Sequence, residues 1–169
     1  MYKYANPEHT FVNCKSKGEF GIHPGVWKWA EVEAWVAQGN TIEPFETDAE
    51  KFEKAKKEAE MALEQEKKAV KTQGVVVDGT LFDTDDSARL SYIEFMLKLM
   101  QSPQYTVSEW KASDGVWVTM DSVLFNKLMA AWEVRLTTIF SFVKAKENEL
   151  KDKTTVESIQ AVDVKYKGV

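Results

Sequence analysis

FDTDDSARLSYIEF, residues 82–95, places a cluster of carboxylates between two apolar segments. Asp83, Asp85 and Ser87 stand at alternate positions, and Glu94 follows Asp83 by eleven residues. These residue types are suitable at positions one, three, five and twelve of a calcium-binding loop. Acidic residues are also typical of the first turn of a helix, where they meet the positive end of the helix dipole. The stretch therefore marks either a metal site or a junction that begins a helix.

Two features of the sequence favour the helix junction. Position six of a calcium loop requires glycine for a sharp turn, and here it is Ala88. A calcium loop is also preceded by a helix, whereas the residues before Phe82 predict a strand. We therefore expect Asp83 or Thr84 to be the N-cap and Asp85 and Asp86 to occupy the first turn. A calcium site at Asp83, Asp85, Ser87 and Glu94 is the less favoured alternative, and no cofactor is expected.

Two β-hairpins are predicted on either side of this helix. Before it, VVVDGTLFD (75–83) places Asp78-Gly79 between apolar residues, which is a strong hairpin signal. After Pro103, which ends the helix, residues 107–118 predict a second hairpin that turns at Ser113-Asp114-Gly115.

Two amphipathic helices are predicted to pack on these hairpins. On the first, apolar residues recur along one helical face: Leu90, Ile93, Met96, Leu97 and Met100. The second begins at Asp121 or Ser122 and has a broad stripe: Leu124, Leu128, Ala131, Trp132, Arg135, Leu136, Ile139, Phe140 and Val143. A capping box from Thr154 to Glu157 predicts a last short helix. Trp110, Trp117 and Trp132 are expected in the core of this part of the chain.

The first half of the chain has a different character. YKYANPEHTFVNCK (2–15) predicts one or two short strands, and residues 26–38 predict a helix that stops at Gly39-Asn40. Thr47 and Glu50 have capping-box spacing before a helix over 49–72. That helix is rich in Ala, Glu and Lys, and its apolar face is thin, so it predicts either a spacer or a weak coiled-coil seam. Self-association through this helix is the favoured interpretation.

Together these elements predict an α+β protein in three segments. Residues 1–46 form an aromatic-rich N-terminal module, and 47–73 form a long, charged helical linker. Residues 74–169 form an α+β domain in which two β-hairpins pack on two amphipathic helices.

Composition excludes several functional classes. The 169 residues are 44% hydrophobic and carry 22 basic and 27 acidic side chains, a net charge of −5. No clustered basic surface predicts nucleic-acid binding, and no stretch approaches a membrane span. The segment MYKYANPEHTF lacks the apolar region of a secretion signal, and the single Cys14 cannot form an internal disulfide. A soluble protein of a cytoplasm is the expectation.

The sequence carries no recognisable catalytic motif. Its two histidines, His9 and His23, stand outside any nucleophile or phosphate-loop pattern, so we expect no enzyme. The crowding of Trp27, Trp29 and Trp35 in a short module is more informative, because that module has few aliphatic residues to bury all three. Exposed aromatic residues are enriched at protein-binding surfaces.

The segment VWKWAEVEAWVAQGNTIEPF (26–45) resembles the N-terminal part of many bacteriophage tail-fibre assembly proteins. In that family an aromatic helix leads into a Trp-x-x-x-Gly-Asn-Thr-x-x-Pro pattern. Trp35, Gly39, Asn40, Thr41 and Pro44 occupy the pattern here. The resemblance implies partner-binding candidates at Trp27, Trp29, Trp35, Asn40 and Pro44.

The remainder of the chain is similar to a phage domain of unknown function that often follows such a segment. The matching residues are Phe82, Asp83, Asp85, Trp110, Asp114, Trp132, Thr155, Val156 and Glu157, while Ser87 lies one place before the family's serine. The resemblance implies a non-enzymatic assembly chaperone that binds a tail-fibre protein in the host cytoplasm. The alternative is a structural component that stays in the virion tail, at the fibre or baseplate, and mediates attachment or oligomerisation. A homo-oligomer through the 48–73 helix fits either role, and a calcium-dependent adhesin or an enzyme is the third, least favoured hypothesis.

Overall fold

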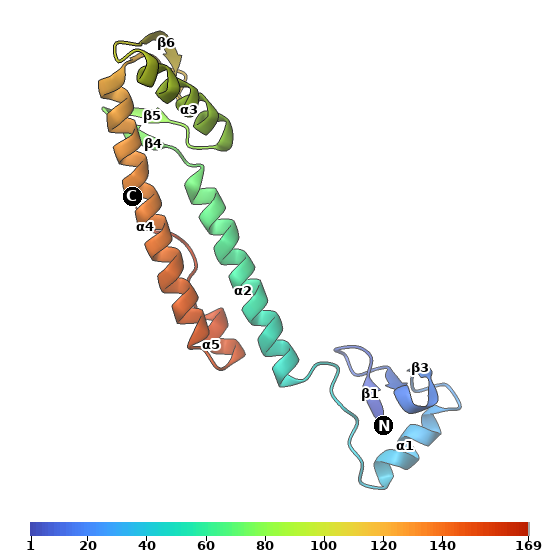
Figure 1. Ribbon diagram of the computed structural model, residues 1–169. Helices are drawn as coiled ribbons and strands as arrows, with labels where there is room; N and C mark the ends of the chain where they lie inside the picture. The colour runs from blue at the N-terminus through green and yellow to red at the C-terminus, as the bar shows by residue number, and fades with distance from the viewer. Residues whose placement is uncertain (169) are drawn as a thin grey trace. The chain divides into compact units, whose positions relative to one another are not determined.

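A computed structural model describes residues 1–168 and has the predicted α+β composition. The chain divides into two compact units, Met1–Lys54 and Ala55–Val169, so the division lies within the long helix. Both units combine helices with antiparallel strands (Figure 1).

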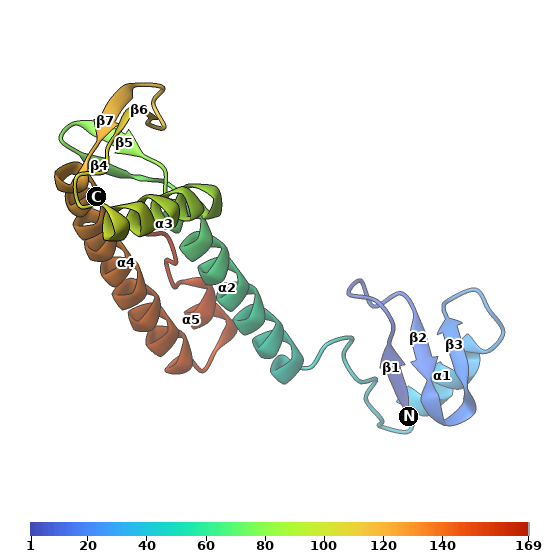
Figure 2. The same ribbon diagram turned by 45° about the horizontal axis from the view of Figure 1, so that its top comes forward.

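The first unit is a three-stranded antiparallel sheet with one helix (Figure 2). Its elements in chain order are β1 (Tyr2–Tyr4), β2 (Val12–Cys14), the 3-10 turn η1 (Lys15–Lys17), β3 (Glu19–Ile22) and α1 (Trp29–Ala37). The first two strands and the helix confirm the predictions. The third strand was not predicted, because Gly18 and Gly21 interrupt its apolar alternation. A small core joins sheet to helix through Tyr2, Val12, Cys14, Ile22 and Val32, all at most 4% exposed.

The long helix α2 (Asp48–Lys71) begins at the predicted capping box. The Thr47 N–H donates to Glu50 Oε2 at 2.7 Å, and the Glu50 N–H donates to Thr47 Oγ1 at 3.1 Å. The hydrogen bonds from Thr47 hold the pKa of the Glu50 carboxyl below its ordinary value. The helix prediction over 49–72 is therefore confirmed to within one residue at each end.

The second unit contains both predicted hairpins. β4 (Val75–Val77) pairs with β5 (Thr80–Phe82), and β6 (Val107–Lys111) pairs with β7 (Trp117–Met120). Asp78 and Gly79 both have positive φ, at 50° and 83°, as the two central residues of a type I′ hairpin turn require.

Helix α3 (Asp86–Gln101) begins later than predicted. Its N-cap is Asp85, whose Oδ1 accepts from the Ala88 N–H at 2.8 Å and from the Ser87 hydroxyl at 3.0 Å. The prediction that Asp83 or Thr84 is the cap is therefore wrong by one or two residues. Asp83 instead offers its main-chain carbonyl to the Tyr92 hydroxyl at 2.9 Å, and burial raises the pKa of that phenol.

Thr84 ties the end of α2 to the first hairpin. It is 3% exposed, and its hydroxyl donates to the Lys71 carbonyl at 2.6 Å while accepting from the Gly74 N–H at 3.1 Å. Gly74 has a φ of 80°, and a Cβ there would lie 2.6 Å from the Phe82 carbonyl oxygen. The chain reversal between α2 and β4 thus depends on a buried hydroxyl and on a position without a side chain.

The predicted apolar face of α3 is not its buried face. Tyr92 and Phe95 are the buried residues of this helix, each 3% exposed. The residues predicted to share one apolar face are 42–76% exposed: Leu90, Ile93, Met96, Leu97 and Met100. Two apolar stripes run along the same helix, and the stripe with the aromatic side chains enters the core because it buries more area per residue.

The core of the second unit lies between both hairpins, α3 and the first turns of α4 (Ser122–Lys151). Its aromatic residues contact one another: Tyr92 stacks on Trp110 at 5.7 Å and meets Trp132 edge-on at 5.8 Å. Trp110 and Trp132 therefore confirm the core prediction. Trp117 is 62% exposed, so the prediction was wrong there; it points from the outer face of β7, next to Lys111.

Helix α4 begins at the predicted cap, where Asp121 Oδ1 accepts from the Val123 and Leu124 N–H groups at 3.0 and 2.8 Å. It runs beside α2, with the segment after α4 between them, in both views (Figures 1 and 2). Arg135 joins the two helices by donating to the Val70 carbonyl at 3.1 Å and to Gln73 Oε1 at 2.9 Å.

The thin apolar face of α2 is covered within the chain. Ala55, Leu63 and Val70 are 2–7% exposed, and Leu63 lies in a hollow with Val143 and Leu150 of α4. The C-terminal segment also contacts α2 through Glu66. The Glu66 carboxylate accepts from Lys165 Nζ at 2.8 Å and from the Tyr166 N–H at 3.0 Å. The helix is thus no free spacer from Ala55 onward, and a homo-oligomer through 48–73 would have to use its remaining polar surface.

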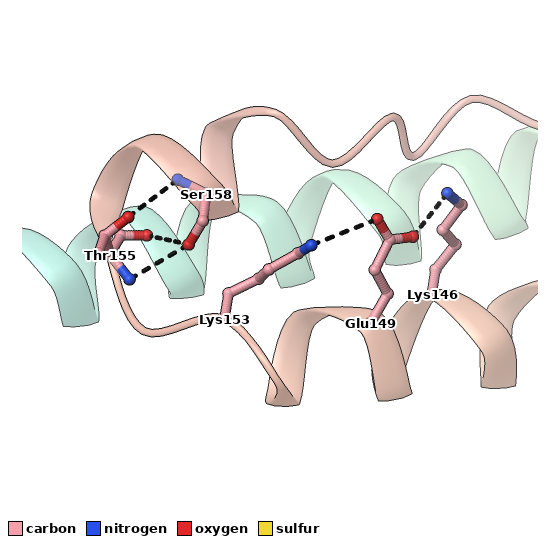
Figure 3. A network of polar contacts seen from close by, with 5 residues as sticks. All are labelled: Lys146, Glu149, Lys153, Thr155 and Ser158. Carbon is pink, nitrogen blue, oxygen red and sulfur yellow. Dashed lines mark hydrogen bonds and ion pairs between the residues drawn. The ribbon is translucent and has the colours of Figure 1, made fainter.

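A short helix, α5 (Val156–Gln160), follows α4 through a tightly bonded turn (Figure 3). Thr155 and Ser158 form its capping box, whereas the sequence predicted Thr154 and Glu157. The observed register buries Ile159, which is 1% exposed. Lys146 Nζ donates to Glu149 at 2.9 Å at the end of α4.

The corrected position of the α3 cap gives a first prediction. Asp85→Ala should lower the melting temperature of the second unit by a few degrees, because it removes the acceptor for the Ala88 N–H. Asp83→Ala should leave the melting temperature unchanged, since Asp83 contributes its main-chain carbonyl. Differential scanning calorimetry of both variants measures the two effects, and an equal loss for both would contradict the assignment.

The same carboxylate should make stability depend on pH. The Ala88 and Ser87 hydrogen bonds hold the pKa of Asp85 below its ordinary value of 3.8. A lowered folded-state pKa contributes stability that is present above the unfolded pKa and is lost as the pH falls through the folded one. The difference between wild type and Asp85→Ala should therefore shrink below about pH 4.

Thr84 gives a second prediction. Thr84→Val keeps the side-chain shape but leaves the buried Gly74 N–H and the Lys71 carbonyl without their hydroxyl partner. We expect a loss of about 1–3 kcal/mol in the free energy of unfolding, measured by urea denaturation. Thr84→Ser retains the hydroxyl, so its free energy of unfolding should fall clearly less. A Ser variant as unstable as the Val variant would contradict the role of the hydroxyl.

Candidate protein-binding site

The first unit contains a cleft of about 750 Å³ lined mainly by aromatic and aliphatic side chains. Its lining comes from the end of β1, the β1–β2 loop, the segment after β3, α1 and the connector that follows: Tyr4, His9, Thr10, Phe11, His23, Pro24, Trp29, Val32, Glu33, Val36, Ala37 and Ile42. We call this hollow the aromatic cleft. Its volume is within the range of sites that bind a small molecule or a few side chains of a partner.

One wall of the aromatic cleft is held by Asn6. The Asn6 Oδ1 atom accepts from the Thr10 and Phe11 N–H groups, both at 3.0 Å, and Nδ2 donates to Thr10 Oγ1 at 2.6 Å. His9 has a φ of 59°, and its ring stacks on Tyr4 at 4.1 Å between centroids. These contacts fix the β1–β2 loop, so the aromatic wall is formed before any partner binds.

His23 contributes another part of the cleft lining. Its ring meets Phe11 edge-on at 5.2 Å, and Nδ1 lies 2.8 Å from the Pro24 carbonyl oxygen. A carbonyl oxygen can only accept, so Nδ1 is the donor and Nε2 is left for other contacts. Phe11 is 40% exposed, which leaves part of its ring open to a partner.

Helix α1 contributes lining residues from its first turn to its last. Trp29 Nε1 donates to Glu33 Oε1 at 3.0 Å, one turn further along the helix. Val32 is buried at the base, and Val36 is 42% exposed at the edge. Glu33 is the one carboxylate among the lining residues, so the cleft is suited to an apolar or aromatic segment with few charges.

The structure does not bring the five predicted binding residues together. Trp29 alone lines the aromatic cleft. Trp35 packs edge-on against Tyr2 at 5.2 Å, and Asn40 Nδ2 donates to the Trp35 carbonyl at 2.8 Å, so both have local structural contacts. Trp27 is 77% exposed, with Lys28 Nζ 5.4 Å from its ring centroid, and Pro44 is exposed in the connector.

The remaining lining residues were missed at the sequence level. Tyr4, His9, Phe11 and His23 come from segments predicted only as short strands and punctuation. Their spacing along the chain carries no periodic signal, because the end of β1, the β1–β2 loop and the segment after β3 bring them to one place. The Asn6-Pro7 pair, typical of a turn, was the one local clue that the β1–β2 loop would be fixed.

The backbone also bears on the calcium hypothesis. Asp86–Gln101 is helical, so Ser87 and Glu94 stand on a helix and cannot follow the course of a calcium loop. Within residues 1–168 no group of three or more His, Cys, Asp and Glu side chains is placed to hold a metal ion. Over the same residues, every helix is too short or too polar to cross a bilayer.

Comparison with known proteins gives one family. The chain matches the family described as Domain of unknown function (DUF4376) over residues 26–166, a range that includes α1, the whole of α2 and the second unit up to residue 166. No curated protein and no solved structure shows significant similarity to the chain. Because the match covers most of the sequence, this protein belongs to the DUF4376 family.

Proposed function

We propose that this chain is a non-enzymatic phage tail protein, an assembly chaperone that binds a tail-fibre protein through its first unit. The observation that carries the proposal is the aromatic cleft, in which fixed aromatic walls leave Phe11 and Val36 partly exposed. The resemblance of residues 26–45 to tail-fibre assembly proteins supports it from the sequence. The proposed location is the host cytoplasm during assembly.

The fixed walls of the aromatic cleft lower the free-energy cost of binding a partner. A partner segment that enters a preformed cleft does not have to pay for ordering its walls, so more of the buried apolar area appears as affinity. Trp27 adds an exposed indole on the same unit, and large aromatic residues often dominate the energetics of protein interfaces. A chaperone of this type would shield an apolar segment of the fibre until the fibre assembles.

A second candidate is a structural component of the virion tail at the fibre or baseplate. The observation that favours it is the exposed apolar face of α3, which would be covered in a permanent assembly. Mass spectrometry of purified particles separates the two proposals, since a chaperone should be absent from them and a structural component present in stoichiometric amounts.

The roles of the tryptophans in the first unit give a third prediction. Trp35→Ala should destabilise that unit by about 1–3 kcal/mol, because it removes the edge-on contact with Tyr2 and part of the small core. Trp27→Ala should change its stability by less than about 0.5 kcal/mol, as expected of an exposed side chain. Hydrogen exchange of the β1 and β2 amides measures both effects, and equal protection in the two variants would contradict these roles.

The fourth prediction tests the proposed function. Co-expression of the chain with the tail-fibre protein of the same genome should raise the soluble yield of the fibre protein and give a complex in size-exclusion chromatography. Val36→Glu places a charge at the edge of the aromatic cleft and should weaken the complex at least tenfold, measured by calorimetric titration. Ala30→Glu is a matched control, since Ala30 is exposed on α1 outside the cleft lining.

Two outcomes would overturn the proposal. If the fibre protein is equally soluble without the chain and forms no complex with it, the chain is not its chaperone. If Val36→Glu and Ala30→Glu weaken the complex equally, the contact lies elsewhere on the molecule. Circular dichroism of both variants shows whether the first unit remains folded.

A further inference from the structure

The second unit has a separate groove of about 790 Å³ where α3 and α4 approach the C-terminal end of α2. Figure 2 shows these three helices meeting at one end of the unit. The floor of the groove is apolar: Ile93, Met96, Met129, Trp132, Leu136 and Phe140. Ile93, Met96 and Phe140 are 42–49% exposed, so much of this apolar surface is open. We call it the α3–α4 groove.

The rim of the α3–α4 groove is basic. Lys68 and Lys71 stand one turn apart on α2, and Arg89 stands on α3, while the single carboxylate of the lining, Asp86, lies 3.4 Å from Arg89. Within residues 1–168 neither Lys68 nor Lys71 has an ion-pair partner. Arg89 is paired with Asp86, and Glu64, which lies within electrostatic range of both lysines, is paired with Lys67, so Lys68 and Lys71 are the cations at the rim that can complement an anionic ligand.

The position of these lysines relative to the apolar floor is fixed by buried contacts. Arg135 of α4 donates to the Val70 carbonyl, and Thr84 donates to the Lys71 carbonyl, so the last turn of α2 is held from both sides. Trp132 is held in the floor by its edge-on contact with Tyr92. The lysines and the apolar floor are thus held at a fixed separation before a ligand binds. A ligand whose carboxylates and apolar face have the same separation can contact both at once.

The open apolar surface extends beyond the groove along α3, with the spacing of residues that a helix-binding surface presents. Leu90, Leu97 and Met100 continue it along α3 and are 50–76% exposed. From Leu90 to Met100 this strip follows about three turns of α3, a length of roughly 15 Å. An amphipathic helix of similar length covers such a strip with residues at i, i+3, i+4 and i+7.

A second copy of this chain fits the surface less well. A twofold dimer places the same surface on both sides of the interface. The groove lining carries three cations against one carboxylate, so self-pairing would bring like charges together.

We propose that the α3–α4 groove binds an acidic amphipathic α-helix of a partner protein, with its apolar face on the floor and its carboxylates at Lys68 and Lys71. The methionines suit this role, because their flexible side chains adapt to the partner's apolar residues. This inference does not depend on the aromatic cleft or on the proposed tail-fibre partner.

The test uses the full chain labelled with ¹³C at the methionine methyl groups, of which the sequence has six. The probe is a 16-residue amphipathic peptide with leucines at helical spacing and glutamates on its flanks. Its titration should shift the Met96 and Met129 methyl resonances and leave Met1 and Met61 unmoved. A peptide with lysine in place of each glutamate should bind at least tenfold more weakly, and added salt should narrow the difference.

Matched variants separate the rim from the floor. The double variant Lys68→Glu with Lys71→Glu should lower the affinity for the acidic peptide at least tenfold and raise the affinity for the basic peptide. Lys57→Glu with Lys144→Glu makes the same change in net charge at exposed positions outside the groove and should have no effect. Ile93→Ser should weaken binding, whereas Val134→Ser, at a residue 68% exposed and outside the groove, should not.

Several results would overturn the proposal. Equal affinity for the acidic and basic peptides would show that the basic rim does not recognise charge. The absence of any Met96 or Met129 shift would show that the peptide does not bind in the groove. Shifts with oleate but not with the acidic peptide would assign the groove to a small amphiphile. A dimer in sedimentation velocity that Ile93→Ser dissociates would assign it to a second copy of the chain. Loss of binding by the Lys57 and Lys144 control would show a general charge effect.

Discussion

The hydrogen bonds from Arg135 to the end of α2 are the constraint on which the second unit depends. The guanidinium lies at the C-terminal end of a 24-residue helix, where it satisfies the Val70 carbonyl and meets the negative end of the helix dipole. The contact fixes the register of α2 along α4. Leu63 then lies near Val143 and Leu150, and the last turn of α2 lies beside the first hairpin. Without a fixed register, the Ala-rich face of α2 would have little shape with which to choose its position.

Much of this architecture could be predicted because it depends on local chemistry. Asp78-Gly79 fixes a hairpin turn whatever surrounds it, and Thr47 and Glu50 satisfy each other across one helical turn. Asp121 likewise begins α4 where its side chain can accept from two free N–H groups. Such signals operate over a few residues, so one sequence contains all the information that they need.

The parts that could not be predicted depend on tertiary competition. Helix α3 carries two apolar stripes, and the choice between Tyr92 with Phe95 and the longer aliphatic stripe was made by the hairpins packed against it. The same competition places the cap at Asp85 instead of the predicted Asp83 or Thr84, because the Thr84 hydroxyl bonds with Lys71 and Gly74. In the first unit, the aromatic cleft joins residues of three loops, and only Trp29 among the predicted candidates reaches it. Helical spacing therefore predicted the helices well but did not predict which residues line the aromatic cleft.

The contacts of Glu66 with Lys165 and Tyr166 have a consequence for the order in which the protein is made. They join residues about a hundred positions apart, so α2 leaves the ribosome long before the segments that cover its apolar face. The first unit has all of its strands and α1 within residues 1–54 and can fold during synthesis. The second unit must wait until residues 135–166 are available. Until then Leu63 and Val70 face water, and the nascent chain carries a folded module ahead of an unfinished one.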